Sequence, residues 1–324
     1  MMEQSQLPLV YDYEPSANHI LKEVLVGLSK SQKSLPPKLL YDQRGSELFE
    51  DICRLPEYYP TRTEHEILRT RAPEMAEFIG PNALIIEPGS GSGEKIRHLL
   101  KELPAPTGYV PVEISREILL RMTEELHDEF PDLTVLPVCA DFTQELELPL
   151  SVDAQVGKKI VFFPGSTIGN LSPAEALAFL RKFGKLVGTG GGLLIGVDLK
   201  KDPETFRLAY DDPAGVTATF NLNLLERLNR EAAAAFDLQN FQHTAFYNEA
   251  EGRVEMHLVS SVDQLVRVNQ TVFRFKEGET IHTENSYKYT TDEFCELGAK
   301  AKFKIKKFWT DAAELFCVYY FVRE

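Results

Sequence analysis

The sequence predicts an α/β protein in which helices wrap a largely parallel sheet, with a second, α+β part inserted into the chain. Apolar strand patterns alternate with helical patterns from about Ala76 to Leu199, and this alternation is typical of βαβ units. The patterns on either side do not alternate. Residues 1–70 indicate helices, and residues 200–286 indicate a long helix followed by hairpins. In such a sheet, ligands bind at the carboxyl ends of the strands.

Five apolar runs within the alternating stretch indicate strands. They are residues 84–87, 109–113, 133–140, 158–165 and 192–199. Helical patterns lie between them, and the one over residues 172–187 begins with a capping box formed by Ser172 and Glu175. Helical crossovers of this kind keep neighbouring strands parallel.

The elements expected after Leu199 break the alternation. They are a helix over residues 203–238, a hairpin over 241–264 turned at Glu251-Gly252, a ribbon over 270–283 with its own Glu-Gly turn, a helix over 291–302, and antiparallel strands over 303–311 and 315–322. We therefore expect a nucleotide-binding core of residues 71–199 plus 287–324. Residues 1–70 plus 200–286 would form a substrate-recognition domain, with the substrate between the two.

Composition is that of an ordinary globular protein. The chain has 324 residues, of which 43% are hydrophobic and 26% are charged. Asp plus Glu number 49 and Lys plus Arg 35, so the formal net charge is −14. This balance argues against a nucleic-acid partner, because contacts from Lys and Arg to phosphates dominate that affinity. No apolar run approaches about 18 residues, so we expect no membrane span.

Cysteine and histidine usage argues against a metal site. The four cysteines lie far apart, and the sequence has neither a C-x-x-C nor an H-x-x-x-H pair. Free thiols in a reducing compartment are the simpler interpretation. The first fifteen residues also lack the pattern of a signal peptide. We therefore expect a cytoplasmic protein that binds no metal, and a monomer.

The most informative stretch is LIIEPGSGSGEK, residues 84–95. An apolar strand ends at Glu87, and Gly89, Gly91 and Gly93 then form a turn into a helix. Glycine lets the backbone approach a bound nucleoside, and a helix N-terminus favours anionic groups. Dinucleotide sites use the spacing G-x-G-x-x-G. The spacing here, E-x-G-x-G-x-G, instead resembles the first motif of S-adenosylmethionine (SAM) methyltransferases.

Acidic residues end the next two strands. Glu113 lies twenty residues after Gly93, where an acid can accept hydrogen bonds from ribose hydroxyls. Asp141 and Phe142 end the following strand. The carboxylate suits the exocyclic amine of adenine, and the ring can cover the base. Each residue alone could be a solvated strand end or part of the core, but together they predict SAM binding.

Four longer segments, together with the glycine turn, resemble the histidine-specific Nα-methyltransferase family. They are YDQRGSELFEDICRLPEYYPTRTEHEIL (residues 41–68), FFPGSTIGNL (162–171), AYDDPAGVTATFNLNLLERLNRE (209–231) and IHTENSYKYT (281–290). The resemblance extends from about Leu35 to the C-terminus. It implies a Rossmann-like SAM-methyltransferase sheet with an inserted α+β substrate domain. The activity it implies is trimethylation of the α-amino group of free L-histidine to hercynine, on the way to ergothioneine-type thiol-histidines.

The resemblance also implies roles for single residues. Those implied to contact SAM are Gly89, Lys95, Glu113, Asp141 and Phe142. Glu113 stands where the family can carry Asp, and both can bridge ribose hydroxyls. At the α-carbon of the amino acid, it implies Asn170 and Tyr210 near the amino and carboxylate groups. Tyr41, with Asn170, would be the catalytic group beside the reacting amine, although a phenol with a pKa near 10 is a poor base at neutral pH.

The imidazole is implied to bind to Tyr58, Glu284 and Ser286, in a pocket lined by Met256. Glu284 and Ser286 are two residues apart, so on an extended segment their side chains face the same side. A carboxylate and a hydroxyl together match an imidazole, which has one N–H donor and one ring acceptor.

Other interpretations stay open at this point. Without the resemblance, Glu284 would be a solvated strand residue, Tyr58 and Tyr59 core aromatics, and Tyr210 a surface residue of a helix. Two other functions remain: Nα-methylation of another free amino acid or small amine, and a SAM-binding subunit that regulates a partner. The set of Glu284, Ser286 and Met256 favours histidine.

Overall fold

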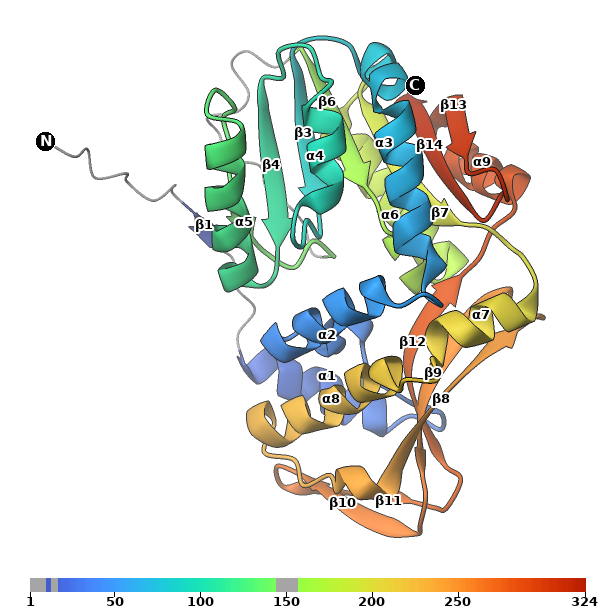
Figure 1. The fold of residues 1–324 in the computed structure, drawn as a ribbon. Helices are drawn as coiled ribbons and strands as arrows, with labels where there is room; N and C mark the ends of the chain where they lie inside the picture. The colour runs from blue at the N-terminus through green and yellow to red at the C-terminus, as the bar shows by residue number, and fades with distance from the viewer. Residues whose placement is uncertain (1–9, 13–16, 144–156) are drawn as a thin grey trace, which may run out of the picture.

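The computed structural model describes residues 10–12, 17–143 and 157–324, in two parts that lie one above the other (Figure 1). A large sheet flanked by helices forms the upper part, and helices over a smaller sheet form the lower part. Residues 1–9 and 13–16, which the sequence analysis includes in the helical N-terminal region, lie outside the described residues.

The described residues of the upper part form one eight-stranded sheet. In spatial order its strands are β1 (Tyr11–Asp12), β5 (Val138–Cys139), β4 (Gly108–Glu113), β3 (Ala83–Pro88), β6 (Lys158–Phe163), β7 (Gly192–Asp198), β14 (Phe316–Arg323) and β13 (Phe303–Thr310). The first six are parallel and the last two antiparallel. The sequence predicts this arrangement for all of them except β1, which, like β2 (Lys33–Ser34), is a short strand in a region expected to be helical. The chain order reverses at β3, and ligands of open α/β sheets bind at such a switch point. The parallel strands end at the edge that faces the lower part (Figure 1).

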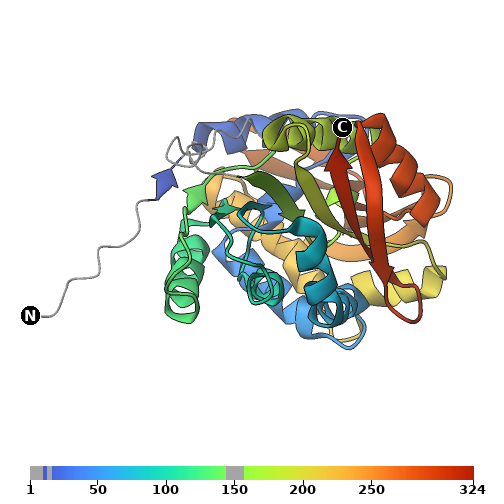
Figure 2. The same cartoon turned by 90° about the horizontal axis from the view of Figure 1, so that it is seen from above.

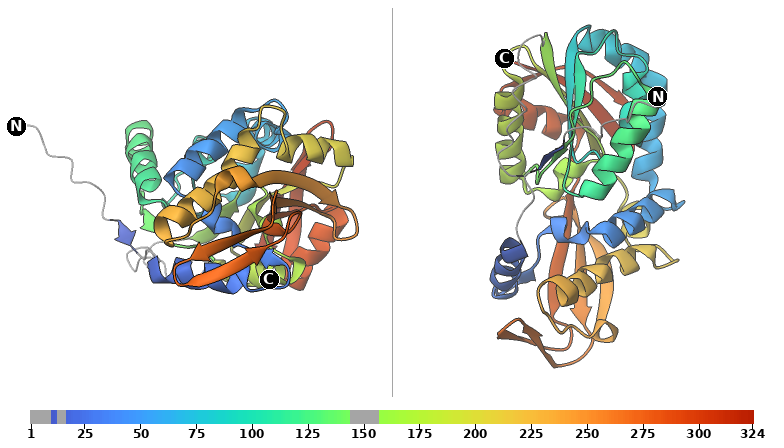
Figure 3. Two further views of the ribbon diagram at one scale, coloured as in Figure 1. Left: turned by 90° about the horizontal axis from the view of Figure 1, so that it is seen from below. Right: turned by 90° about the vertical axis from the view of Figure 1, so that its left-hand side faces the viewer.

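Helices cover both faces of this sheet (Figures 2 and 3). One face carries α3 (Tyr59–Ile79), α4 (Glu94–Leu100) and α5 (Arg116–Glu129), and the other carries α6 (Pro173–Val187) and α9 (Thr291–Lys300). In β3, Ile85 packs in the core between the sheet and α3, α4 and α5, whereas Leu84 and Ile86 pack in the core between the sheet and α6 and α9. Burial on both sides explains why the strands are apolar throughout rather than alternating.

The lower part has its own core. Its helices are α1 (Ala17–Leu28), the 3₁₀ turn η1 (Pro37–Leu40), α2 (Gln43–Arg54), α7 (Pro203–Tyr210) and α8 (Val216–Glu231). Its sheet has the order β2 (Lys33–Ser34), β12 (Thr280–Tyr287), β9 (Arg253–Ser260) and β8 (Phe241–Asn248), and a separate ribbon is formed by β10 (Gln264–Val268) and β11 (Thr271–Phe275). Leu224 and Leu228 of α8 pack with Leu258 of β9 in this core.

The helix boundaries follow from capping side chains, and one predicted helix, over residues 203–238, is wrong. The capping box of Ser172 and Glu175 opens α6 as expected. The expected helix over residues 203–238 is instead two helices, because Asp212 caps the start of α8 by accepting bonds from the backbone of Val216 and Thr217. The alanine-rich end is not helical. Its backbone pairs with the ribbon, where the N–H of Ala235 donates to the carbonyl of Arg267 at 2.9 Å. Tertiary pairing here overrides the helix propensity of alanine.

Two strand predictions need correction. The hairpin of β8 and β9 turns at Glu251-Gly252 as predicted, but the ribbon over residues 270–283 is wrong. Its first half pairs with β10, and its second half becomes β12, which pairs with β9. The strand expected over residues 133–140 is regular only at Val138–Cys139, since Pro137 before it has no N–H to donate.

The division into two domains remains our proposal. Helix α3 runs across the expected boundary at residue 70, and β12 across the one at residue 286. Among the described residues, none of the helices is both long and apolar enough to cross a membrane.

Glu87 at the end of β3 generates a prediction about stability. Its side chain is 1% exposed and accepts a hydrogen bond from the Tyr109 hydroxyl, and burial raises the pKa of Glu87 to about 8. The usual pKa of a free glutamate is about 4.3. A raised pKa favours folding at low pH, and this contribution is lost as the pH rises towards about 8.

Glu87→Gln should therefore flatten the fall in unfolding free energy between about pH 5 and pH 8, since each unit of pKa shift corresponds to about 1.4 kcal/mol. Urea unfolding of both proteins across this range measures the effect. Glu77→Gln on the exposed side of α3 is the control. Parallel pH curves for wild type and Glu87→Gln would show that Glu87 is not the titrating group.

Candidate active site

The glycine turn lies at the carboxyl end of β3. Gly89, Gly91 and Gly93 have φ angles of 71°, 52° and 68°, which favour glycine. A Cβ added at Gly89 would lie 3.1 Å from the ring of Phe142, and one at Gly93 would lie 2.7 Å from the Met122 side chain. The absence of Cβ atoms therefore lets the turn pass close to its neighbours.

Glu113 is anchored against this turn. One carboxylate oxygen accepts the backbone N–H of Gly91 at 3.0 Å, and the other accepts those of Ile114 and Ser115. Burial nevertheless raises the pKa of Glu113. The hydroxyl oxygen of Ser90, in the same turn, is buried and has no hydrogen-bond partner among the described residues. A fixed carboxylate beside a free hydroxyl and a glycine backbone fits a polar nucleoside.

Asp141 and Phe142 follow β5 at the same edge. Asp141 accepts hydrogen bonds from Thr143 and from the ammonium of Lys38 at 3.1 Å, and these outweigh burial and lower the pKa of Asp141. The Phe142 ring packs against Phe163 and Phe179 and lies over Gly89. The structure thus brings together the strand-end residues that the sequence singles out.

Lys95 has a partner that the sequence did not suggest. Its ammonium lies 2.6 Å from the carboxylate of Glu64, which is 1% exposed and also accepts the backbone N–H of Gly165. Lys95 therefore stands at this edge, but its charge is already paired. The signal for Glu64 is weak, because an acid within a helical pattern is more often solvated.

The candidate imidazole residues lie on one face of the lower sheet. In the pairing of β12 with β9, Glu284 lies opposite Met256 and Ser286 opposite Val254, and the register shifts by one residue at Thr283. Directly opposite residues share a face, so Glu284, Ser286 and Met256 point to the same side, as predicted. All three are buried.

Two hydrogen bonds connect this strand to the expected α-carbon residues. The amide of Asn170 donates to the Glu284 carboxylate at 3.2 Å, and the hydroxyls of Tyr210 and Ser286 lie 2.8 Å apart. Asn170 reaches β12 because the 3₁₀ turn η3 (Thr167–Asn170) packs closely, and a Cβ on Gly169 would lie 2.8 Å from a backbone oxygen of β12. Each bond joins a residue expected at the α-carbon to one expected at the ring.

Aromatic side chains line the same region. The rings of Tyr41 and Tyr58 each make edge contacts with Phe49, at 5.6 and 6.1 Å between centroids. Tyr58 also meets the edge of Tyr210 at 6.1 Å, and Tyr41 meets Phe220 at 5.5 Å. Tyr58 and Tyr210 are buried in the core of the lower part, not exposed on a helix surface.

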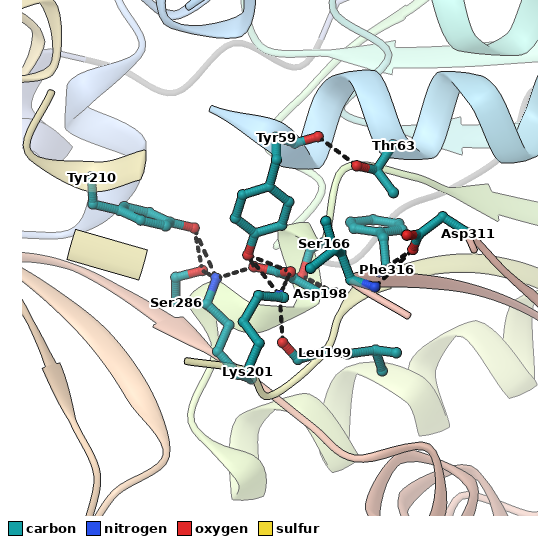
Figure 4. A network of polar contacts seen from close by, with 12 residues as sticks. Tyr59, Thr63, Ser166, Asp198, Leu199, Lys201, Tyr210, Ser286, Asp311 and Phe316 are labelled. Atoms are coloured by element: carbon teal, nitrogen blue, oxygen red, sulfur yellow. Dashed lines mark hydrogen bonds and ion pairs between the residues drawn. The ribbon is translucent and has the colours of Figure 1, made fainter. Parts of the chain in front are cut away.

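A buried ionic network that the sequence does not predict lies next to Tyr210 and Ser286. Asp198, the last residue of β7, accepts hydrogen bonds from the Tyr59 hydroxyl and the Lys201 ammonium (Figure 4). Lys288 donates to Asp198 at 2.6 Å, to Tyr210 at 2.9 Å and to Ser286 at 2.8 Å. No local pattern indicates these contacts, since they join segments far apart in the chain.

Charge states differ across the site. Burial raises the pKa of Glu284 to about 7, although Lys288 and the bond from Asn170 act against it. Burial would also raise the pKa of Asp198, but Lys288 and Lys201 outweigh burial and lower it. Burial, with Glu284 nearby, raises the pKa of Tyr41 well above its usual range. Tyr41 therefore stays protonated at neutral pH.

One cluster of potential metal ligands occurs among the described residues. Glu255, His257 and His282 offer ligand atoms within 4.8 Å of one another. The two imidazole rings, however, are stacked, with centroids 4.5 Å apart and planes 13° from parallel. Lone pairs in parallel ring planes do not converge on one point, and Glu255 is already bonded to His257 and Arg253. We assign no metal ion to this cluster.

Comparison with known proteins places these features in a family. A sequence profile described as "Histidine-specific methyltransferase, SAM-dependent" matches residues 20–323. The chain is 40% identical to the histidine N-alpha-methyltransferase of Mycolicibacterium smegmatis, covering 93% of this chain and 94% of that protein. It is 42% identical to the protein of the same name from Mycobacterium tuberculosis, covering 90% and 91%.

A third relative, ergothioneine biosynthesis protein 1 of Neurospora crassa, is 32% identical over 86% of this chain and 32% of its own length. The profile covers nearly the whole chain, including both the glycine turn and the strand that carries Glu284 and Ser286. This chain therefore belongs to the SAM-dependent, histidine-specific methyltransferase family.

Proposed function

We propose that this protein transfers methyl groups from SAM to the α-amino group of free L-histidine, in three successive steps that end at hercynine. The observation that carries the proposal is the buried pair of Glu284 and Ser286, which share one face of β12 with Met256 opposite. These groups match the donor and the acceptor of an imidazole. The names of the bacterial relatives support the same substrate.

We assign the edge at the ends of β3, β4 and β5 to SAM, which when bound supplies an electrophilic methyl group on a sulfonium. Glu113 would accept hydrogen bonds from ribose, Asp141 from the adenine amine, and Phe142 would cover the base beside Gly89. The contact between Gly89 and Phe142, with Glu113 held by Gly91, supports this assignment. Lys95 would line the edge while paired with Glu64.

We assign the amino acid to the point where the Asn170–Glu284 and Tyr210–Ser286 contacts meet. Asn170 and Tyr210 would hold the α-amino and α-carboxylate groups. Tyr58, Glu284 and Ser286 would hold the ring. A site whose buried polar groups need both partners of an imidazole rejects an apolar side chain, because those groups would otherwise remain unpaired.

Tyr41 would position the amine rather than deprotonate it. Before each transfer the ammonium would lose a proton to water, and as the N–C bond forms the S–C bond of SAM breaks and S-adenosylhomocysteine leaves. The raised pKa of Tyr41 keeps the phenol protonated, so its oxygen can accept a hydrogen bond from an amine N–H and orient the lone pair. Most of the rate enhancement would then come from holding the amine in line with the methyl group. The final product is a fixed cation, and the faces of Tyr41 and Tyr58 suit it by cation–π attraction.

We also propose a cytoplasmic monomer that works without a metal ion and has no nucleic-acid or membrane partner. The net charge of −14 supports the absence of a nucleic-acid partner, and the scattered cysteines support a reducing compartment and the absence of a metal ion.

Incubation of the purified protein with SAM and each of the twenty amino acids, followed by mass spectrometry, tests the function. We expect histidine to gain one, two and then three methyl groups, with the trimethylated form accumulating. Faster methylation of another amino acid would favour the alternative substrate class. SAM binding without methylation of any amino acid would indicate a regulatory subunit.

SAM affinity should depend on Glu113 and Asp141. Alanine at either position should weaken SAM binding by about 1–3 kcal/mol, because a buried polar partner is lost. Calorimetry measures the affinity, with Glu117→Ala on the exposed side of α5 as the control. Unchanged affinity in a folded variant would place that residue outside the cofactor site.

Substrate choice should depend on Glu284 and Met256. Glu284→Ala removes the acceptor of the imidazole N–H, and a hydrogen bond to a charged group contributes about 1.5–3 kcal/mol, or roughly 10- to 150-fold in kcat/KM for histidine. Combining it with Met256→Val enlarges the pocket, so indole should gain relative to imidazole. Competition between histidine and tryptophan measures this.

Two controls accompany the double variant. Glu284→Gln keeps the shape of the side chain without the charge, and Glu277→Ala removes an exposed acid in the turn before β12. If the double variant keeps the wild-type preference for histidine, Glu284 does not contact the ring.

A further inference from the structure

Lys288 is a fully buried cation in direct contact with two residues of the proposed substrate site. Its side chain is 0% exposed, and it lies one residue beyond β12. The ammonium has three N–H donors, and the structure gives it three acceptors: Asp198, the Tyr210 hydroxyl and the Ser286 hydroxyl. Every donor is used, so the position of Lys288 is fixed.

The fixed ammonium determines the direction of the hydrogen bonds that the two hydroxyls make. An ammonium cannot accept a hydrogen bond, so both hydroxyl oxygens must accept from Lys288. Tyr210 and Ser286 also lie 2.8 Å from each other, and only one of them can donate in that contact. The hydroxyl proton of the other remains available. When Ser286 donates in that contact, the pair offers one oriented O–H donor, that of Tyr210, to a neighbouring acceptor.

The charges around Asp198 do not balance within this group. One carboxylate faces two ammonium groups, those of Lys288 and Lys201, whose side chains are 0% and 8% exposed. The third partner, the Tyr59 hydroxyl, is neutral because burial and Asp198 raise the pKa of Tyr59. Burial lowers the pKa of Lys201 to about 8, although Asp198 acts against it, so both lysines are mainly protonated at pH 7 and the three charged side chains together carry one excess positive charge. Burying a charge that is not compensated is costly, so such a site favours a ligand that brings a negative charge.

We propose that Lys288 is a positioning residue: it fixes the Tyr210 hydroxyl directly and through Ser286, so that Tyr210 presents an oriented hydroxyl donor, with a positive charge behind it, to the α-carboxylate of the amino acid substrate. This inference rests on the proposed function and extends it. It assigns to Lys288 the selection of amino acids over amines that have an imidazole but no carboxylate. Lys288 itself is too enclosed to touch the substrate, and it acts through the two hydroxyls.

Lys288→Met tests the proposal, because methionine has nearly the same length but neither charge nor donors. Asp198 keeps Lys201 and Tyr59 as partners in this variant. Lys201→Met is the matched control: it removes the other ammonium from the same carboxylate, and Lys201 donates to Asp198, Tyr59 and a backbone oxygen instead of the site hydroxyls. Two quantities are measured for each protein: the KM for histidine and the inhibition constant of histidinol, which has an alcohol in place of the carboxylate.

We expect Lys288→Met to raise the KM for histidine by about 10- to 100-fold and to change histidinol inhibition by less than about 3-fold. Lys201→Met removes the excess charge but leaves Lys288 and both hydroxyls in place, so it should change the ratio of the two constants by less than Lys288→Met does. SAM affinity, measured by calorimetry, should stay at the wild-type value in both. Equal losses for histidine and histidinol in Lys288→Met, or equal ratios in the two variants, would overturn the proposal.

Two further measurements keep the result decisive. If Lys288→Met does not fold, Asp198→Asn combined with Lys288→Met and Lys201→Met removes all three charges and leaves no unpaired ion in this group, and the same ratio is measured on it. Wild-type protein that methylates no histidine would refute the proposed function itself. Wild-type activity together with an unchanged ratio in the variants would refute only the role of Lys288.

Discussion

The two parts of the molecule are joined by the ion pair between Asp198 and Lys288. Asp198 ends β7 of the upper sheet, and Lys288 follows β12 of the lower sheet. Both side chains are 0% exposed, so each charge has lost its hydration and depends on the other. Removing one partner of such a pair typically costs about 3–5 kcal/mol. The Tyr59 hydroxyl bonds the same carboxylate from the start of α3. Three elements from distant parts of the chain therefore meet at one anion, directly behind Tyr210 and Ser286.

Buried carboxyl groups in this protein have different protonation behaviour because their partners differ. Asp198 faces two ammonium groups and has a lowered pKa, so it stays ionised and serves as a structural anion. Glu284 receives a neutral hydrogen bond from Asn170, and burial raises its pKa to about 7. A free imidazole has a pKa of about 6.5. The carboxyl of Glu284 and a bound imidazole would therefore titrate in the same range, which lets the pair share a proton. Surroundings that shift the pKa values of two carboxyl groups in opposite directions can give them different roles, one structural and the other in binding a ligand.

The sequence predicts best what depends on neighbouring residues. The glycine turn, the acids at the strand ends, the capping box of α6 and the parallel pairing of β3 to β7 all follow from local patterns. Lys288 and Lys201 could not be found in this way, because nothing within a few residues of either shows which distant carboxylate it meets. The same holds for Lys95, which the family resemblance places on SAM and which the structure pairs with Glu64. The alanine-rich end of the predicted long helix fails for a related reason, since its backbone pairs with β10 of the ribbon.

Thr283 is an extra residue in β12, and it determines which side chains of this strand face the proposed pocket. A side-chain period of two would place His282 on the same face as Glu284 and Ser286. The register instead pairs His282 with His257 and Glu284 with Met256, passing over Thr283. His282 consequently stacks on His257 on the opposite face. If the pairing of His282 with His257 continued without the extra residue, Glu284 would lie opposite Glu255, and Thr283 and Asn285 would face the proposed pocket. One inserted residue is enough to move a whole set of side chains across a sheet. The extra residue therefore keeps His282 off the face that Glu284 and Ser286 share, whereas on a regular strand all three side chains would lie on one face.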